Sequence, residues 1–485
     1  MKLKNLIKNI DVKKIIGSLD LEITGINHDS REIKPGDLFV AIEGFNVDGH
    51  DFLNEVGYKG AKAVIVEKDV TLKEDITIIK VEDTRIALAE LSSVFLGEPS
   101  KKMEVIGVTG TNGKTTITYL IRSIFEENNK KAGVIGTNGN IINGKLYETE
   151  NTTPESLALQ KNFYEMARVN TDICIMEVSS HSLDMKRVEN TDFNIGVFTN
   201  LTEEHLDYHN TMDEYFNSKL KLFYMTKDVN IINIDDTYGK FIIEKVSKEK
   251  ANIITYGITN EADIFATDIV YNSTGVSFKL NTPKDSINIE LNIPGEFSVY
   301  NALAAASCGF AYSIDLKTIK AGLEKVKGVK GRFEIVPTNR DFAVIIDFAH
   351  TADSLEKTLT AIDKFAEGRK VVVFGAGGNR DKTKRPIMGE TVAKHADLSI
   401  VTSDNPRDEN PEKIIQDVIK GIEKVKGDYV YYVDRKDAIR YALENAKPKD
   451  IILLAGKGHE TYTIIKDKVI PFDERKIVLD ILKGI

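Results

Sequence analysis

A short stretch, "GVTGTNGKTT" at residues 107–116, has the residue types that bind nucleotide phosphates. Its glycines at 110 and 113 let backbone N–H groups turn toward a phosphate, and the helix expected after them adds its dipole. The Lys114 ammonium reaches terminal phosphates, and the Thr115 hydroxyl is suited to Mg²⁺. Where the common eight-residue pattern has glycine this chain has Val108, so the match is to a shorter variant. We therefore predict binding of ATP or GTP.

Carboxylate and imidazole side chains follow two later apolar runs. Glu177 lies at the end of a strand expected in "ICIMEVSSH", where it could hold Mg²⁺ directly or through water. His205 and His209 follow another apolar run, in "TNLTEEHLDYHN". An ordinary acidic residue at a strand end explains Glu177 equally well, so the metal role stays a hypothesis at this point.

Lys219 has an unusual place in the helical pattern "MDEYFNSKLKLFY". It shares one helix face with Tyr215 and with Leu222 or Phe223. A lysine on such an apolar face usually extends its ammonium group into water. Spacing alone therefore gives Lys219 no functional role.

The elements that would position these residues are apolar, β-branched runs, each ending in a polar turn and leading into a helical pattern. They are "EVIGVTG", "AGVIGTNG", "ICIMEVSSH", "NIGVFTNL", "VNIINIDD" and "NIITYG", then "AVIIDFAH", "VVVFGAGGNRD", "LSIVTSDNPR", "YVYYVDR" and "DIILLAGKGHE". Continuous apolar runs that alternate with helices predict α/β domains with parallel strands covered on both faces. Ligands of such sheets bind beyond the carboxyl ends of the strands, where nearly every polar motif here lies.

Two segments divide the 485 residues, a length that favours several domains. The first, "FLGEPSKKM", follows a region of short strands ("DLFVAI", "AKAVIVEK", "ITIIKVED"), and the second is the Gly/Lys-rich "KVKGVKGRFEIV". We expect domains at residues 1–98, 99–331 and 332–485.

Composition limits the classes of function. Hydrophobic residues are 42% and charged residues 29% of the chain, as in soluble globular proteins, and the net charge of −9 argues against a nucleic-acid binder. Cys174 and Cys308 stand in apolar contexts and are expected to be buried free thiols, which suits a cytoplasmic protein. Charges interrupt the first twenty residues too often for a signal peptide, and no run is long enough for a membrane span.

The order of the motifs resembles that of the Mur ligase family. The motifs are "GTNGKTT", "NTTP", "EVSSHSLDMKRV", "TNLTEEHLDYH", "GRFE", "DFAHTADSLEK", "FGAGGNRDKTKRP", "DNPR" and "AGKGHE". With "NHDSREIKPGDLFVAIEG" the resemblance extends from residue 27 to about residue 476. It implies a small N-terminal UDP-binding α/β domain, a central P-loop ATPase-like domain and a C-terminal Rossmann-like domain that binds the amino acid.

The resemblance also implies an activity, the ATP-dependent formation of an amide bond in peptidoglycan precursor synthesis. The acceptor would be UDP-N-acetylmuramoyl-L-alanyl-D-glutamate, and the amine would come from a diamino acid. ATP would phosphorylate a carboxylate, and the amine would displace phosphate from the acyl phosphate. Positioning and charge neutralisation would supply most of the catalysis.

Residue by residue, the resemblance implies an ATP and Mg²⁺ site that closes between the last two domains. The implied ATP contacts are Gly110, Thr111, Asn112, Gly113, Lys114, Thr115, Thr116, Asn301 on the adenine side, Arg332 on the phosphate side, and Asp347. The implied metal residues are Thr115, Glu177, His205 and Lys219, and the catalytic residues are Lys114, His205, Lys219 and His350. Lys219 falls where the family carries a carbamylated lysine, which has a carboxylate in place of an ammonium.

The acceptor contacts implied by the resemblance lie in two places. Ser30 with Phe45, Asn46 and Val47 would form the uridine pocket, and Thr152, Thr153, Ser179, Met185 and Arg187 would bind the muramoyl dipeptide. The Arg187 guanidinium suits a carboxylate or phosphate. Two residues depart from the family. Met185 stands where relatives often have glutamine, and Ala352 replaces a common proline.

The loop "SDNPRDE" bears on which amino acid is added. In the family "DNPR" goes with meso-diaminopimelate, since the arginine, here Arg407, pairs with a distal carboxylate that lysine lacks. The other implied contacts are Arg380, Asp404, Asn405, Pro406, Gly456 and Glu460, whose carboxylate suits an ammonium group. A site built around such a group rejects a substrate lacking it by roughly 10⁴-fold. Lysine stays open as the main rival, and a two-carboxylate diamino acid other than diaminopimelate, such as lanthionine, fits the same chemistry.

Other functions remain as alternatives. A sister ligase or a folate polyglutamylating enzyme is the nearest rival, although "HDSREIKPGDLFVAIEG" resembles the UDP-recognition region. A nucleotide-regulated binding protein, an NTPase motor and an inactive scaffold belong to other classes. We expect a monomer without nucleic-acid partners or membrane insertion.

Overall fold

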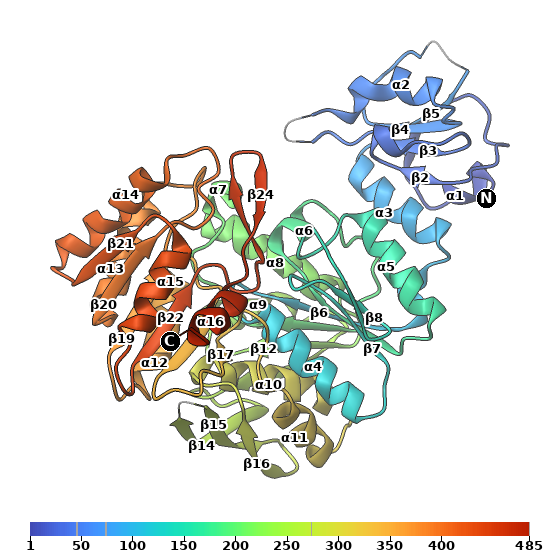
Figure 1. Ribbon diagram of the computed structural model, residues 1–485. Helices are drawn as coiled ribbons and strands as arrows, with labels where there is room; N and C mark the ends of the chain where they lie inside the picture. The colour runs from blue at the N-terminus through green and yellow to red at the C-terminus, as the bar shows by residue number, and fades with distance from the viewer. Residues whose placement is uncertain (45–46, 73–74, 273, 485) are drawn as a thin grey trace.

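The computed structural model describes residues 1–44, 47–72, 75–272 and 274–484. Three β-sheets form the centres of three successive parts of the chain, and a two-stranded hairpin stands apart from them. In Figure 1 the N-terminal part lies at one end of the molecule, joined to the rest beside α3 (Thr84–Phe95) and α5 (Ser156–Arg168), while the central and C-terminal parts lie side by side. The three-domain α/β fold is as predicted.

The N-terminal sheet has the strand order β1-β5-β4-β3-β2, with β1 antiparallel and the other strands parallel. Its strands are β1 (Val12–Ile16), β2 (Ile26–Asn27), β3 (Leu38–Val40), β4 (Ala63–Val66) and β5 (Thr77–Val81). Its helices are α1 (Leu3–Leu6), α2 (Leu53–Tyr58) and α3, with 3₁₀ turns at Ser30–Glu32, Gly49–Phe52 and Pro99–Lys102. The Asp83 carboxylate caps α3 by accepting from Arg85 N and Ile86 N, which satisfies amides that a helix start leaves unpaired.

The central sheet has the order β16-β15-β14-β13-β12-β11-β6-β10-β7-β8-β9. The six runs predicted as parallel strands are β6 (Glu104–Thr109), β7 (Ala132–Ile135), β10 (Ile173–Glu177), β11 (Ile195–Phe198), β12 (Val229–Asn233) and β13 (Asn252–Gly257). Their mutual pairings are all parallel. Further strands at both ends of the sheet are not predicted: β8 (Asn140–Ile142), β9 (Lys145–Tyr147), β14 (Ile264–Asn272), β15 (Gly275–Asn281) and β16 (Ser286–Leu291). Of these, β14 pairs parallel to β13, and the remaining pairings are antiparallel.

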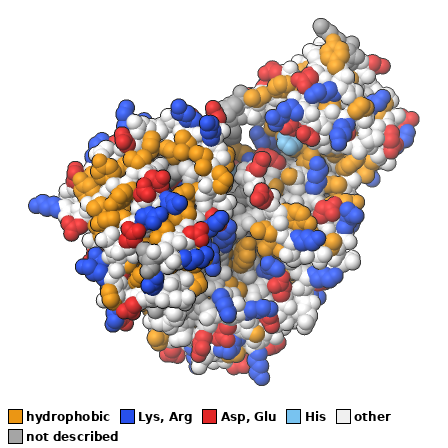
Figure 2. Space-filling view, in the orientation of Figure 1, with side chains coloured by type: hydrophobic (Ala, Val, Ile, Leu, Met, Phe, Trp, Pro, Cys, Tyr) orange, Lys and Arg blue, Asp and Glu red, His pale blue; other side chains and the backbone are white. Residues whose placement is uncertain are grey.

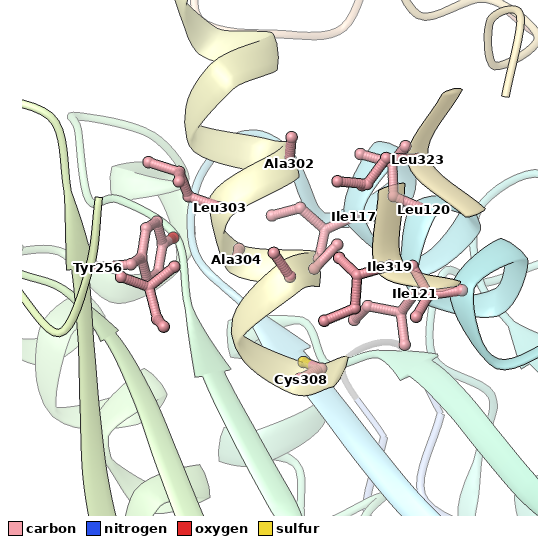
Figure 3. Packing of buried hydrophobic residues seen from close by; sticks show 14 of the residues in the cluster. Ile117, Leu120, Ile121, Tyr256, Ala302, Leu303, Ala304, Cys308, Ile319 and Leu323 are labelled. Carbon is pink, nitrogen blue, oxygen red and sulfur yellow. The ribbon is translucent and has the colours of Figure 1, made fainter. Parts of the chain in front are cut away.

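The helix that follows the phosphate loop is held by the largest core of the molecule. The central helices are α4 (Lys114–Glu127), α5, α6 (Ser180–Asp184), α7 (Leu206–His209), α8 (Met212–Met225), α9 (Thr237–Val246), α10 (Glu296–Ala311) and α11 (Leu316–Lys325). Ile117 and Leu120 of α4 pack against Ala302 of α10 and Leu323 of α11 (Figure 3). A Cβ at Gly322 would lie 2.5 Å from Ile124 Cα, so this close helix contact requires glycine. The buried packing fixes the direction of α4.

The C-terminal sheet has the order β17-β18-β22-β19-β20-β21, parallel except for β17. Its strands are β17 (Glu334–Val336), β18 (Ala343–Asp347), β19 (Lys370–Phe374), β20 (Leu398–Thr402), β21 (Tyr429–Tyr432) and β22 (Ile451–Ala455). The helices are α12 (Ala352–Asp363), α13 (Lys384–His395), α14 (Pro411–Lys424), α15 (Arg435–Glu444) and α16 (Glu474–Leu482), and the hairpin is β23 (Tyr462–Ile465) with β24 (Lys468–Pro471). All five predicted strands are present, whereas β17 and the hairpin were not predicted.

The C-terminal part docks on the phosphate loop. Asp353, in the first turn of α12, accepts from Thr202 Oγ1 at 2.8 Å and from Asn112 Nδ2 at 3.4 Å. Phe297 of α10 packs on Phe333, with ring centroids 5.3 Å apart. Figure 2 shows the visible face hollowed where these parts meet, with Lys and Arg side chains beside the hollow. The exact boundaries at residues 98 and 331 stay predictions.

Across the described ranges, none of the helices combines the length and the apolar character that crossing a membrane requires. Cys174 and Cys308 are buried and unpaired, as expected from their apolar contexts.

Candidate active site

The phosphate loop occupies the turn between β6 and α4. Gly110 and Gly113 have φ values of 146° and 90°, which residues other than glycine rarely adopt. A Cβ on Gly110 would lie 1.9 Å from Thr199 Oγ1, and one on Gly113 would lie 2.5 Å from Asn301 Oδ1. The loop is therefore packed on the end of β11 and on α10, and Asn301 borders the loop itself.

Neighbouring loops fix the remaining predicted residues of this turn. Thr111 N donates to Asn200 O at 2.8 Å, and Asn112 N donates to Asn200 Oδ1 at 3.0 Å. Thr111 Oγ1 lies 3.2 Å from the Tyr215 hydroxyl, and Thr116 is buried in the first turn of α4. These protein contacts define the shape of the loop.

Two amines meet at one carbonyl oxygen of this loop. Lys114 Nζ donates to Gly110 O at 2.9 Å and to Thr111 O at 2.7 Å, and Lys219 Nζ donates to Gly110 O at 2.9 Å. Lys219 is only 2% exposed, with its amine 4.6 Å from the centre of the Tyr215 ring. The ammonium group does not reach water, in contrast to the usual behaviour of such a lysine.

The electrostatics of this pair favour a neutral amine. Burial lowers the pKa of Lys219 well below its ordinary value, and the adjacent Lys114 lowers it further. Burial also lowers the pKa of Lys114. Since a neutral amine is a nucleophile and an ammonium is not, Lys219 has the chemistry needed to react with CO₂.

Hydroxyl and carboxylate oxygens gather beside Lys114. Glu177, 1% exposed, accepts from Thr115 Oγ1 at 3.0 Å and from Thr137 Oγ1 at 3.1 Å. Thr137 Oγ1 lies 3.0 Å from Thr152 Oγ1. Thr152, which is predicted to bind the muramoyl dipeptide, therefore lies next to the predicted metal residues. Mg²⁺ prefers such oxygen ligands and completes its shell with water and phosphate oxygens, so Thr115 and Glu177 fit this ion.

In the described part of the chain, no three His, Cys, Asp or Glu side chains converge as a metal cluster. His205 therefore does not join Glu177 in a set of that kind. Its imidazole lies among other rings, 4.8 Å from His181 and 6.1 Å from Tyr215 between centroids. Burial lowers the pKa of His205 to about 4, and the neighbouring His181 and lysines add to this, so its ring is neutral at pH 7.

Glu204 connects His205 with the C-terminal part of the chain. Its carboxylate oxygens lie 3.8 Å from His205 Nε2 and 4.0 Å from His350 Nε2. Burial opposes ionisation, yet the two histidines and the two lysines lower the pKa of Glu204. The carboxylate stays ionised and supplies a negative charge close to the converging amines.

The last two predicted ATP contacts come from around β18. Arg332 Nη2 donates to Thr115 Oγ1 at 3.3 Å, and its guanidinium lies 4.6 Å from the centre of the Phe348 ring. Asp347 accepts from Phe333 N at 2.7 Å and also from Ala349 N and Thr358 Oγ1. Arg332 thus reaches the phosphate loop, while the Asp347 carboxylate organises the turn that carries Phe348 and His350.

The predicted dipeptide contacts form one connected group. Thr153 Oγ1 donates to Glu177 O at 2.9 Å and receives Ser179 N at 3.1 Å. Arg187 Nη1 donates to Thr153 O at 3.2 Å, and its Nη2 forms an ion pair with Glu155 at 2.7 Å. Arg187 Nη2 also lies 3.4 Å from Met185 Sδ, so the methionine packs directly on this guanidinium.

The predicted uridine residues lie in the N-terminal part. Ser30 is buried at the start of a 3₁₀ turn, and its carbonyl accepts from Lys59 Nζ at 2.9 Å. Val47 is 56% exposed. Phe45 and Asn46 lie outside the described residues, so their role stays a prediction.

The C-terminal motifs meet in the loops after β19, β20 and β22. Asn405 Nδ2 donates to Glu460 Oε2 at 3.0 Å, and Gly378 N donates to Asn405 O at 2.9 Å. A Cβ at Gly456 would lie 2.9 Å from Asp404 Oδ2, and one at Gly378 would lie 1.9 Å from Pro406 O. The loops are packed backbone to backbone.

Two arginines stand at this junction. Arg407 has a φ of 51°, held by its N–H to Ile464 O at 3.1 Å and by Lys466 N to its own carbonyl at 2.9 Å. Burial lowers the pKa of Arg407, and the nearby Arg380 lowers it further. Its Nη1 donates to Gly378 O at 2.8 Å. Arg407 and the nearby Arg380 both border Gly377, and two such cations are suited to a carboxylate.

Comparison with known proteins gives the family. Residues 22–96 match the catalytic domain of the Mur ligase family, residues 108–309 the Mur ligase middle domain, and residues 331–458 the Mur ligase glutamate ligase domain. The chain belongs to the Mur ligase family. The prediction from the order of the motifs is confirmed.

Relatives of this Mur ligase include UDP-N-acetylmuramoyl-L-alanyl-D-glutamate–2,6-diaminopimelate ligases. The ligase of that name from Caldanaerobacter subterraneus subsp. tengcongensis is 48% identical over 482 residues, 99% of each chain. The one from Alkaliphilus oremlandii is 48% identical over 483 residues, 100% of this chain and 99% of the relative. A solved structure of a ligase with this name has a TM-score of 0.71 at 30% identity and covers 100% of this chain and 99% of that one.

Two residues of this Mur ligase site were missed in the sequence. Glu204 stands beside His205 in "TEEH", and Lys457 stands in "GKGHE". Both motifs contain predicted site residues, but the predicted roles fall on the neighbours of Glu204 and Lys457. Only the fold shows that Glu204 faces His350 and that Lys457 is completely buried between Asn405 and Glu460.

Proposed function

We propose that this Mur ligase uses ATP to join meso-diaminopimelate to UDP-N-acetylmuramoyl-L-alanyl-D-glutamate, a step in peptidoglycan precursor synthesis. The observation that carries the choice of amino acid is the pair Arg380 and Arg407 beside Glu460. A diamino acid with a distal ammonium and a distal carboxylate matches one acidic and two basic groups. Relatives at 48% identity bear the name of this activity.

The proposed reaction has two steps. The acceptor's carboxylate attacks the γ-phosphorus of ATP, forming an acyl phosphate and ADP. The amine of diaminopimelate then attacks the acyl carbon, loses a proton, and expels phosphate. Lys114 and Arg332 would neutralise phosphate charge, which is supported by the position of Lys114 in the phosphate loop and by the hydrogen bond of Arg332 to Thr115.

Mg²⁺, when bound by Thr115 and Glu177, would neutralise phosphate charge, and carbamylated Lys219 would add a carboxylate beside them. The support for carbamylation is the buried amine of Lys219, whose pKa is lowered and which faces a second amine. The carbamate would carry a negative charge and would pair with the Lys114 ammonium. His205 and His350, which both lie near the Glu204 carboxylate, would flank the transferred phosphoryl group.

The C-terminal domain would complete the ATP site by docking Asp353 on Asn112 and Thr202. Asn301 would border the nucleotide beside Gly113, and Asp347 would hold the turn that carries His350. Thr152, Thr153, Ser179, Met185 and Arg187 would bind the dipeptide, and Ser30 with residues 45–47 the uridine. We propose a cytoplasmic monomer.

The test is whether ADP formation requires every substrate. ATP, Mg²⁺, the UDP-linked dipeptide and meso-diaminopimelate together should give ADP, phosphate and a product whose mass equals both reactants less water. Omitting either the acceptor or the amine should stop ADP release. ATP hydrolysis that continues without both would instead mean a nucleotide-driven protein that makes no amide bond.

A further inference from the structure

Lys457 is completely buried in the turn that follows β22, and it connects three segments of the predicted amino-acid site. Its Nζ donates to Tyr462 O at 2.8 Å and to Asn405 Oδ1 at 3.1 Å, and it pairs with Glu460 Oε2 at 3.3 Å. These partners come from the loop after β20, the loop after β22, and β23. A buried charge with three such partners is fully satisfied.

Lys457 settles how the Asn405 amide is turned. Asn405 Oδ1 receives both Lys457 Nζ and Ile464 N, the second at 2.9 Å. Two donors on one atom identify it as the amide oxygen, so the NH₂ group must face the other way, where it donates to Glu460 Oε2. Without the ammonium, one backbone N–H would hold the amide alone.

The same contacts divide the two oxygens of Glu460. Oε2 receives both Asn405 Nδ2 and Lys457 Nζ, at 3.0 Å and 3.3 Å. Within the described residues no protein donor contacts Oε1. One oxygen therefore anchors the carboxylate, and the other is left for a ligand cation.

We infer that Lys457 is a positioning residue for diamino-acid binding, which holds Asn405 and Glu460 so that one oxygen of Glu460 receives the substrate ammonium. This inference rests on the proposed function. It adds a residue that affects binding of the amine substrate without touching that substrate. Groups held by locked neighbours bind with little loss of conformational freedom. The effect of Lys457 is therefore on the affinity for the diamino acid, while the phosphate loop in the central domain is untouched.

The experiment is steady-state kinetics on Lys457→Met, which keeps the side-chain length and removes the donors. KM for meso-diaminopimelate should rise by about tenfold or more, while kcat and KM for ATP change by less than about twofold. Lys413→Met removes an exposed lysine of the same domain and should leave all three constants at wild-type values. An unchanged KM for diaminopimelate, or equal losses in all constants, would overturn the inference.

A double-mutant comparison separates positioning from general damage. In a Glu460→Gln background, Lys457→Met should add less than about threefold to KM, because its effect acts through a group already disabled. If the two changes multiply independently, Lys457 does not act through Glu460. Should Lys457→Met fail to fold, Lys457→Gln retains amide donors for Tyr462 O and should show the same KM effect in smaller measure. A wild type inactive with diaminopimelate would contradict the proposed function instead.

Discussion

Lys219 and Lys457 are two buried lysines with opposite surroundings. Lys457 has a carboxylate, an amide oxygen and a carbonyl as partners, whereas Lys219 has one carbonyl, an aromatic ring and a second amine. Burying a charge is costly unless it is paired and hydrogen-bonded. The difference indicates that the amino-acid site is assembled for stability and binding, while the phosphate site keeps an unfavourable amine for its chemistry.

The largest effect is expected when Lys219 loses its amine. Lys219→Met should lower kcat by about 10³-fold or more, because no carbamate could form beside the phosphates. Lys219→Glu, which carries a permanent carboxylate, should recover part of that loss. The measurement is ADP release at saturating substrates. If Lys219→Met turns over like wild type, the contrast between the two lysines has no catalytic meaning.

The second-largest effect should be a loss of selectivity between amino acids when Arg407 is replaced. Arg407→Met should reduce the preference for meso-diaminopimelate over L-lysine by roughly 100-fold, because only diaminopimelate has the distal carboxylate. KM for ATP should stay at its wild-type value. The ratio of kcat/KM for the two amino acids gives the answer, and an unchanged ratio means that another group reads the carboxylate.

Replacing Lys457 and replacing Lys219 should have different effects on the thermal unfolding temperature, Tm. Lys457→Met leaves Glu460 without its buried cation and should lower Tm by roughly 5 °C. In CO₂-free buffer, where Lys219 carries no carbamate, Lys219→Met removes a buried free amine and should leave Tm equal or higher. Scanning calorimetry of both variants with the wild type makes the comparison. A loss of Tm in Lys219→Met as large as that in Lys457→Met contradicts it.

The smallest effect is on the pH dependence of stability. Burial lowers the pKa of Lys219 below its ordinary 10.5, so the unfolded chain binds this proton more tightly than the folded chain. Stability should therefore rise with pH through this group, up to about 10.5. Lys219→Met lacks that contribution, so its advantage in Tm over the wild type should shrink as pH rises from 7 to about 10. An advantage that stays constant or grows with pH would mean that the folded protein does not lower the pKa of Lys219.

The sequence allows prediction of the parts of the fold that one local pattern determines. All the continuous apolar runs predicted as parallel strands of the central and C-terminal domains are strands, because burial on both faces leaves an unbroken apolar sequence. The strands β14, β15 and β16 were missed since they alternate, as in "IFATDIVYN", where one face is exposed. A search for continuous runs passes over that pattern.

Site residues were predictable where a motif carries its own chemistry, as in "TNGKTT". They were not where the partners decide. Nothing near Lys457 in the sequence shows that Asn405, some fifty residues earlier, receives its ammonium. Lys219 illustrates the same limit, since its spacing predicts an ordinary lysine and only Gly110 O and Lys114 make it unusual.

In the proposed function, this Mur ligase selects a diamino acid by its distal carboxylate. A competition experiment tests this: the wild type is incubated with ATP, Mg²⁺, the UDP-linked dipeptide and equal amounts of meso-diaminopimelate and L-lysine. Mass spectrometry then gives the amount of each product. We expect the diaminopimelate product almost alone. Lysine incorporated in equal or greater amount would contradict it.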